Sequence, residues 1–402
     1  MEELSKTLDE VFRREKSRVV GALVRLVGNL DAAEEAFQEA VVAALSSWHA
    51  TGTPANPAAW LTTAAKNAAR DAARHRRIVD KKAPLLVKNE SVTPDTPGSV
   101  GDDELRLIFT CCHPVLTLES QVALTLKVVA GFSTEEIARA FLSPEKTIAQ
   151  RLVRAKRTIE EEHVSYVVPE RAELPARLAS VLAVVYLLFN EGHTTRRGAL
   201  MRLDLQAEAL RLGRLLCDLL PDEPEVFGLF ALIAFGVART STRTDEHGEM
   251  LLLSEQARSR WDRPTIKDGL MALQRARRLG GRGSYALQAG IAACHATAAT
   301  WDTTDWSRIL HAYDELLTVA PSPVVELNRA VAVCMVDGPA KGLAALAALE
   351  APLAAYHLFY AIRADFRGRL GEDARDDYRR ALNLTGNEGE RSFLRRKIDP
   401  AR

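Results

Sequence analysis

Residues 132–157 read FSTEEIARAFLSPEKTIAQRLVRAKR, which predicts two short helices joined by a tight turn. Ser133 or Thr134 can cap the first helix, because its side-chain oxygen can accept a free amide of the first turn. Ser143 can cap the second helix, and Pro144 suits its first position. The stretch therefore predicts a helix-turn-helix.

The second helix of this pair has a basic outer face. Ile148, Leu152 and Ala155 recur at helical spacing and are expected to point inward. The side chains left outside are Lys146, Gln150, Arg151, Arg154 and Arg157. A basic second helix of this kind is suited to the DNA major groove, so the chain is a candidate DNA reader.

The composition of the whole chain favours packed helices and gives no sign of a polyanionic partner. The 402 residues are enough for two to four domains. Lys+Arg and Asp+Glu are both 53, so any DNA binding must come from local basic patches. Aromatic residues make up only 6%, and alanine and leucine dominate, which indicates an all-α fold.

The cysteines and the apolar runs indicate where in the cell the protein is expected. Five scattered cysteines without CxxC spacing argue against a disulfide framework and a structural zinc site. The charged, amphipathic residues 1–16 are unlike a signal peptide, and the longest apolar run, 226–238, is too short to span a bilayer. We therefore expect a reduced, soluble, cytoplasmic protein with no metal, no cofactor and no membrane contact.

The chain divides into four predicted segments. A small helical domain is expected over residues 4–78, followed by a Pro- and Gly-containing linker over 79–101. The helix-turn-helix lies in a second small domain, 102–162, and a large helical region fills 164–402.

The end of the large region repeats every 34 residues. Ala296, Ala330 and Ala364 follow this spacing. Two further sets do the same, namely Trp306 with Ala340 and Ala374, and Tyr313 with Ala347 and Ala381. This is the period of the tetratricopeptide (TPR) helix pair, so TPR-like repeats are predicted near 285–397. An ordinary alanine-rich bundle is the alternative.

A basic stripe is predicted on the last helix of the first domain. Lys66, Arg70, Arg74 and Arg77 follow the spacing of one helix face. Such a stripe can follow DNA phosphates, although most charge runs are solvated faces. Trp60 lies just upstream, where it can stack on an unpaired base or pack in the core.

The helix before it is acidic at its start. Its polar side chains include Asp31, Glu34, Glu35, Gln38 and Glu39. Acids in a first turn are favoured by the helix dipole. They can equally form a docking face for a basic protein partner.

Nothing in the sequence indicates enzyme chemistry. Cys111, Cys112 and His113 are adjacent, but neighbouring helical cysteines point about 100° apart and make poor joint ligands. The glycine-rich residues 280–283 lack the strand context of a phosphate loop, and no catalytic carboxylate pair or triad stands out. We therefore expect no enzyme and no catalytic residues.

The order of these motifs resembles a bacterial RNA polymerase sigma factor of the extracytoplasmic-function (ECF) type. The family's acidic motif stands here as DAAEEAFQE (31–39), its Pro-hydrophobic-x-Trp-Leu motif as NPAAWL (56–61), and its basic recognition motif lies in 148–159. The resemblance covers about the first two fifths of the chain. It implies two DNA- and polymerase-binding domains and partners in core RNA polymerase and promoter DNA.

The resemblance also implies roles for individual residues. Polymerase docking falls to Asp31, Glu34, Glu35 and Gln38. Recognition of the downstream, −10 element falls to Asn56, Trp60, Lys66, Asn67, Arg70, Arg74 and Arg77. Recognition of the upstream, −35 element falls to Lys146, Thr147, Gln150, Arg151, Arg154 and Arg157.

The remaining region has a resemblance of its own. VLAVVYLLFNEGH (181–193), followed by TPR-like repeats, is similar to the long C-terminal extension of one ECF subgroup. This implies a regulatory extension that acts on the sigma core or binds a regulatory protein. The alternative function is a helix-turn-helix regulator with a TPR-like sensor, independent of sigma activity. That alternative leaves the acidic helix and the basic stripe without a role.

Overall fold

The computed structural model describes residues 2–80, 100–141, 143–193, 197–198 and 201–399. The regular secondary structure of the described residues is almost entirely helical, so the expectation of an all-α fold is confirmed. It forms two compact units, Met1–Val184 and Val185–Arg402, which we call unit 1 and unit 2. The division falls within the helix α8 (Leu174–His193).

Unit 1 begins with three helices, α1 (Glu2–Val27), α2 (Leu30–Thr51) and α3 (Pro57–Asp80). Gly28 ends α1 with a φ of +71°, a conformation that favours glycine. The Asn29 side chain then caps α2 by accepting the amide of Ala32. The three helices bury a core that includes Leu23, Trp48 and Leu61.

The second part of unit 1 contains the helix-turn-helix. Its helices are α4 (Val100–Cys111), α5 (Leu118–Leu124) with the π-helical turn η1 (Thr125–Val129), α6 (Thr134–Ala140) and α7 (Glu145–Glu161). Ser133 caps α6 in a capping box with Glu136. Most of the predicted linker, residues 81–99, lies outside the described residues; 79–80 end α3 and 100–101 begin α4.

The predicted cap of the second helix is wrong by one residue. The N-cap of α7 is Pro144, and no side chain caps this helix. The Ser143 hydroxyl instead donates to the Phe141 carbonyl, while the Ser143 amide bonds to Ala138. Ser143 therefore completes the turn after α6 rather than capping α7, and the Pro144 carbonyl accepts the amides of Thr147 and Ile148.

The two parts of unit 1 pack against each other through α1 and α4. The Tyr166 hydroxyl lies within hydrogen-bond distance of the carbonyls of Gly21 (3.0 Å) and Asp103 (2.7 Å). A Cβ at position 21 would lie 2.8 Å from the Asp103 oxygen, so this close approach needs glycine. Arg25 adds an ion pair to Asp103 at 3.2 Å.

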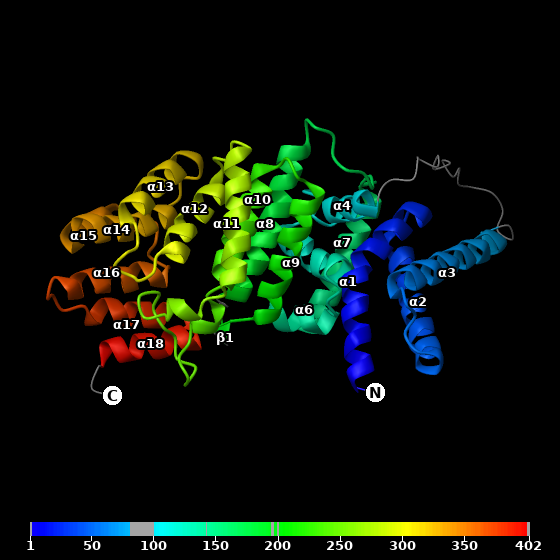
Figure 1. Cartoon of the computed structure of the whole chain (residues 1–402), viewed down its shortest axis with the longest axis horizontal. Coiled ribbons are helices and arrows are strands. Elements are labelled where there is room, and N and C mark those ends of the chain that lie inside the picture. The colour runs from blue at the N-terminus through cyan, green and yellow to red at the C-terminus, as the bar shows by residue number, and fades with distance from the viewer. Residues whose placement is uncertain (1, 81–99, 142, 194–196, 199–200, 400–402) are drawn as a thin grey trace. The chain divides into compact units, whose positions relative to one another are not determined.

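Unit 2 contains the second half of α8 and then α9 (Leu203–Leu219), α10 (Pro224–Val237), α11 (Arg263–Arg278) and α12 (Ser284–Thr297). The apolar helix α10 packs against α9, α11 and α12, and Figure 1 shows α10, α11 and α12 side by side. Their core includes Phe230, Phe235, Trp261 and Leu273. Two short 3-10 turns, η2 (Thr240–Thr242) and η3 (Arg258–Arg260), lie between α10 and α11.

The rest of unit 2 is a row of helices in which each packs on the next. They are α13 (Trp306–Val319), α14 (Pro323–Asp337), α15 (Pro339–Leu346) with the turn η4 (Ala347–Leu349), α16 (His357–Arg369), α17 (Arg375–Leu384) and α18 (Glu388–Ile398) (Figure 1). Ala296, Ala330 and Ala364 are buried in α12, α14 and α16. Two short strands, β1 (Arg197–Gly198) and β2 (Gly386–Asn387), pair in parallel.

Two segments, Leu174–His193 and Pro224–Thr242, are long and apolar enough to cross a membrane by length and composition alone. Both segments are longer than the apolar run 226–238, which the sequence analysis judged too short to span a bilayer. Helices in the core of a soluble protein pass the same test, and Leu229, Ile233 and Phe235 of the second segment are buried in unit 2. The finding is weak support for a membrane span.

Candidate functional site

The outer face of α7 carries the polar side chains predicted for it. Ile148, Leu152 and Ala155 are buried against the rest of the helix-turn-helix, as expected. Lys146, Thr147, Gln150, Arg154 and Arg157 are exposed, and Arg151 is partly buried. Arg157 forms a surface ion pair with Glu161 at 3.2 Å. The structure thus brings this set together on one accessible, basic surface, which we call the α7 face.

The outer face of α3 is also accessible where the structure describes it. Lys66, Asn67 and Arg70 are exposed, whereas Leu61, Ala65 and Ala69 are buried. The side chains of Arg74 and Arg77 lie outside the described residues.

Asn56 has a structural role that the sequence analysis missed. Its side-chain oxygen accepts the Ala59 amide at 3.0 Å, and its carbonyl accepts the Trp60 amide. Asn56 therefore caps α3. The sequence pattern that could have predicted this cap is an Asn directly before a Pro at the start of a helix.

Trp60 lies at the edge of the core of unit 1. It is partly buried, and its ring meets the buried Trp48 ring edge-on at a centroid distance of 5.4 Å. Phe12 stacks on the same Trp48 ring at 5.9 Å. Core packing, the alternative to base stacking, therefore buries much of the Trp60 side chain. Only part of the ring remains accessible for other contacts.

The acidic residues of α2 are divided between surface and interior. Asp31, Glu35 and Gln38 are exposed, but Glu34 is only 5% exposed. Glu34 pairs with Lys16 of α1 at 3.3 Å and with Lys156 of α7 at 2.6 Å. In this arrangement Glu34 is not part of the predicted docking face, because it lies on the side of α2 that meets α1 and α7.

The charges of this cluster, Lys16, Asp31, Glu34 and Lys156, are balanced. Burial lowers the pKa of Lys16, whose ammonium also donates to the Lys127 carbonyl at 2.6 Å. Burial opposes ionisation of Glu34, but the two lysines outweigh it and lower its pKa. Lys156 also pairs with Asp31 at 2.6 Å, and both acids raise its pKa against the effect of burial. We call these four residues the charge cluster.

The charge cluster joins the helix-turn-helix to the acidic helix. A second contact between them is the hydrogen bond from the Asn29 side chain to Glu160, at 3.4 Å. Sequence reasoning missed Lys16 altogether. The one indication in the sequence that Lys16 is buried was its place on the apolar face of α1. It lies four residues after Phe12 and three or four residues before Val19 and Val20.

The cysteines and acids of unit 1 can be examined as metal ligands and as nucleophiles in the part of the chain that the structure describes. Among the described residues, no group of three or more His, Cys, Asp or Glu side chains could hold a metal ion. Cys111 and Cys112 are buried, and burial raises the pKa of the Cys112 thiol to about 12. Both thiols are therefore packing groups rather than nucleophiles at neutral pH.

Comparison with known proteins defines the class. Residues 11–78 match Sigma-70 region 2, residues 106–159 match Sigma-70 region 4, and residues 177–277 match a family of unknown function (DUF6596). The RNA polymerase sigma factor CarQ of Myxococcus xanthus is 35% identical over 132 residues, which cover 32% of this chain and 73% of CarQ. The chain therefore belongs to the RNA polymerase sigma factors and is ECF-like.

A second relative is similar along nearly the whole chain. It is the uncharacterized protein R00370 of Rhizobium meliloti (strain 1021), 39% identical over 394 residues, 96% of this chain and 93% of the relative. The arrangement of sigma regions plus a long helical region is thus shared by another protein.

Proposed function

We propose that this sigma factor binds core RNA polymerase and directs promoter recognition, melting and transcription initiation as an ECF-type sigma factor with a regulatory C-terminal extension. The observation that carries the proposal is the presence of both sigma regions in one folded unit, each with a basic face open to solvent. The two sigma regions weigh against the alternative of a conventional helix-turn-helix regulator.

The α7 face is proposed to read the −35 element. Lys146, Gln150 and Arg154 project from the first three turns of α7, where a recognition helix meets base edges. An arginine contact to guanine contributes about 1–3 kcal/mol of discrimination. Arg157 can exchange its surface pair with Glu161 for a phosphate at little cost, because exposed ion pairs contribute only about 0–1 kcal/mol.

The start of α3 and the loop before it are proposed to recognise the −10 element. Lys66 and Arg70, with Arg74 and Arg77 further along α3, would contact phosphates. The cap at Asn56 and the packing of Trp60 on Trp48 would hold the loop in place while it accepts a base flipped from the stack.

Polymerase docking is proposed for Asp31, Glu35 and Gln38, with Glu34 joining after a rearrangement. The −35 and −10 elements lie about 25 base pairs apart, or about 85 Å at about 3.4 Å per base pair. The contact of 2.6 Å between Lys156 and Asp31 cannot persist when α7 and α3 occupy both elements. We therefore infer that the charge cluster opens in the initiating complex.

The extension is proposed to be a TPR-like regulatory region in a cytoplasmic protein. Each of the helices α12 to α17 packs on the next, and grouping them as α12 with α13, α14 with α15, and α16 with α17 puts the three buried alanines in the first helix of each pair. TPR-like arrays present an extended surface to peptides or proteins. The extension would use such a surface for the sigma core or for a regulatory protein.

Variants of the two faces test the proposal. Arg154→Ala and Arg151→Ala should weaken use of the −35 element but leave core polymerase binding intact. Glu35→Ala or Asp31→Ala should weaken core binding without changing DNA preference. Arg171→Ala, an exposed arginine elsewhere in unit 1, is the control. The measurements are promoter-specific transcription on templates with altered −35 or −10 elements, and a titration of core polymerase binding. The assignment of faces would be overturned if the arginine variants lost core binding and the acidic variants changed DNA preference.

A further inference from the structure

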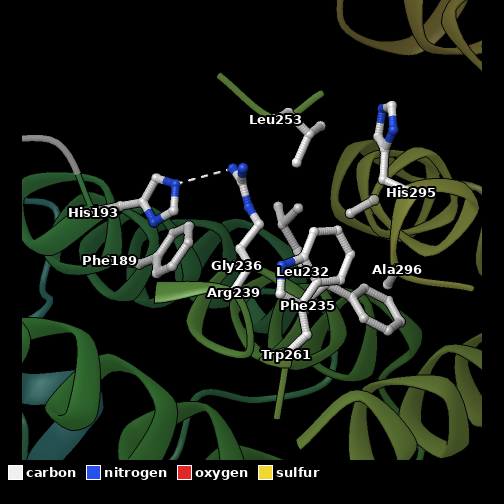
Figure 2. A pocket seen from close by; sticks show the side chains of 11 residues that line it. Phe189, His193, Leu232, Phe235, Gly236, Arg239, Leu253, Trp261, His295 and Ala296 are labelled. Carbon is white, nitrogen blue, oxygen red and sulfur yellow. Dashed lines mark hydrogen bonds between the residues drawn. The ribbon is translucent and has the colours of Figure 1, made fainter. Parts of the chain in front are cut away.

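Unit 2 contains an apolar pocket with one cationic side chain at its wall. Its volume is about 200 Å³, and it lies between α8, α10, α12 and the segment that leads into α11. Phe189, Phe235, Leu253 and Trp261 supply apolar walls (Figure 2). Gly236 is required beside them, because a Cβ there would collide with the Phe189 ring.

The cation is Arg239, which follows the C-terminal end of α10. Its guanidinium donates to the Nε2 atom of His193 at 3.1 Å, as the dashed line in Figure 2 shows. No described carboxylate lies within ion-pair distance of Arg239. Burial lowers the pKa of this guanidinium to about 10, so it remains charged at neutral pH. A desolvated cation without a counter-charge is costly, which makes this position attractive for an anion.

The neighbouring histidines do not supply that counter-charge. Burial, followed by the nearby arginines, lowers the pKa of His295 to about 4 and that of His193 well below its usual range. Both rings are therefore neutral at pH 7. Their Nδ1 atoms are buried and have no hydrogen-bond partner among the described residues. A second guanidinium, Arg243, donates to the His193 carbonyl and adds positive potential, partly offset by Glu390.

We propose that this pocket binds a small organic carboxylate with a flat, apolar body about the size of benzoate. An apolar cavity of about 150 Å³ accepts benzene, so about 200 Å³ leaves room for a ring and a carboxylate. The aromatic walls contact the ring, and the guanidinium of Arg239 pairs with the carboxylate in the planar geometry that this group favours. Binding in this pocket does not require sigma activity.

Calorimetric titration of the purified full-length protein tests the proposal. The probes are benzoate and phenylacetate, with benzamide as the neutral analogue, phenyl phosphate as the other anionic head group, and inorganic phosphate as an anion without a ring. Benzoate or phenylacetate should bind with a Kd near or below about 1 mM, a range open to ligands of this size. Benzamide should bind at least about tenfold more weakly, and inorganic phosphate should not bind.

Two variants separate charge from volume. Arg239→Met should weaken carboxylate binding by about 10- to 100-fold, as expected for loss of a charged hydrogen bond, and leave benzamide unchanged. Ala292→Phe, which fills the pocket from α12, should weaken every ring-containing probe. Arg278→Met, an exposed arginine on α11, should change neither.

Several results would overturn the proposal. They are no binding of either carboxylate at millimolar concentration, equal binding of benzoate and benzamide, or undiminished binding by folded Arg239→Met. Tight binding of phenyl phosphate without binding of either carboxylate would show that the ligand is a phosphate monoester and not a carboxylate. If Arg239→Met does not fold, the comparison of benzoate with benzamide and the Ala292→Phe variant still decide.

Discussion

Substitution of Glu34 by glutamine examines the charge cluster most sharply. Glu34 is buried and lies 3.3 Å from the Lys16 ammonium and 2.6 Å from that of Lys156. Glutamine keeps the shape of the side chain but removes its charge. Lys156 retains Asp31 and is partly exposed, whereas Lys16 is left buried with no described carboxylate from the cluster in contact.

The expected cost is large. Removal of one partner from a buried ion pair costs about 3–5 kcal/mol, because the remaining charge is uncompensated. We take about 3 kcal/mol, since Lys16 keeps its hydrogen bond to the Lys127 carbonyl. The matched variant Glu35→Gln changes an exposed residue one position along and should cost less than about 0.5 kcal/mol.

Hydrogen exchange is the suitable assay, because a chain with two units need not unfold in one step. A loss of about 3 kcal/mol corresponds to roughly 100-fold faster exchange of protected amides in α1, α2 and α7. Amides of unit 2 should not change. Equal exchange in Glu34→Gln and Glu35→Gln would refute the reasoning.

The effect should depend on pH in one direction. The pKa of Glu34 is lowered in the folded protein, so its contribution is present above the unfolded pKa of about 4.3. It is lost as pH falls through the lower folded pKa. The difference between wild type and Glu34→Gln should therefore be constant from about pH 5.5 to 7.5 and shrink below about pH 4.

Four further variants test unit 1. Ser133→Ala should destabilise the helix-turn-helix by about 1 kcal/mol through loss of the capping box, whereas Ser143→Ala should cost much less; chemical denaturation with a probe in unit 1 compares them. Lys156→Ala should loosen α7 from α2 and strengthen core polymerase binding, and weaker binding in a titration would contradict this. Tyr166→Phe should cost about 1–2 kcal/mol in the same denaturation assay, because the carbonyls of Gly21 and Asp103 lose the one hydroxyl hydrogen that they share, and a change below about 0.3 kcal/mol would count against it.

Local features of the fold could be predicted from the sequence, and features that depend on distant contacts could not. The helix pair at 132–157 and the inward side chains of α7 follow from short-range spacing and capping chemistry. The sequence could not show that Glu34 is buried while Glu35 is exposed. The partners that surround Glu34, Lys16 and Lys156, lie far from it along the chain. The prediction that Ser143 caps α7 is wrong, because its hydroxyl donates to the Phe141 carbonyl at the end of α6 instead.

The same limit applies to unit 2. A period of 34 residues indicated which alanines lie in the core of α12, α14 and α16, but Ala347, a member of another set, is exposed in η4. The pocket beside Arg239 had no sequence signal. Its walls come from four separate segments, and an arginine at a helix end is ordinarily a solvated residue.

Transcription by purified core RNA polymerase, with and without this protein, on a library of fragments from the source genome tests the central claim most directly. The account predicts discrete RNA starts that require the protein and disappear when either the −35 or the −10 element of the template is changed. RNA starts that are no more frequent or specific than those of core polymerase alone, on every fragment, would contradict it.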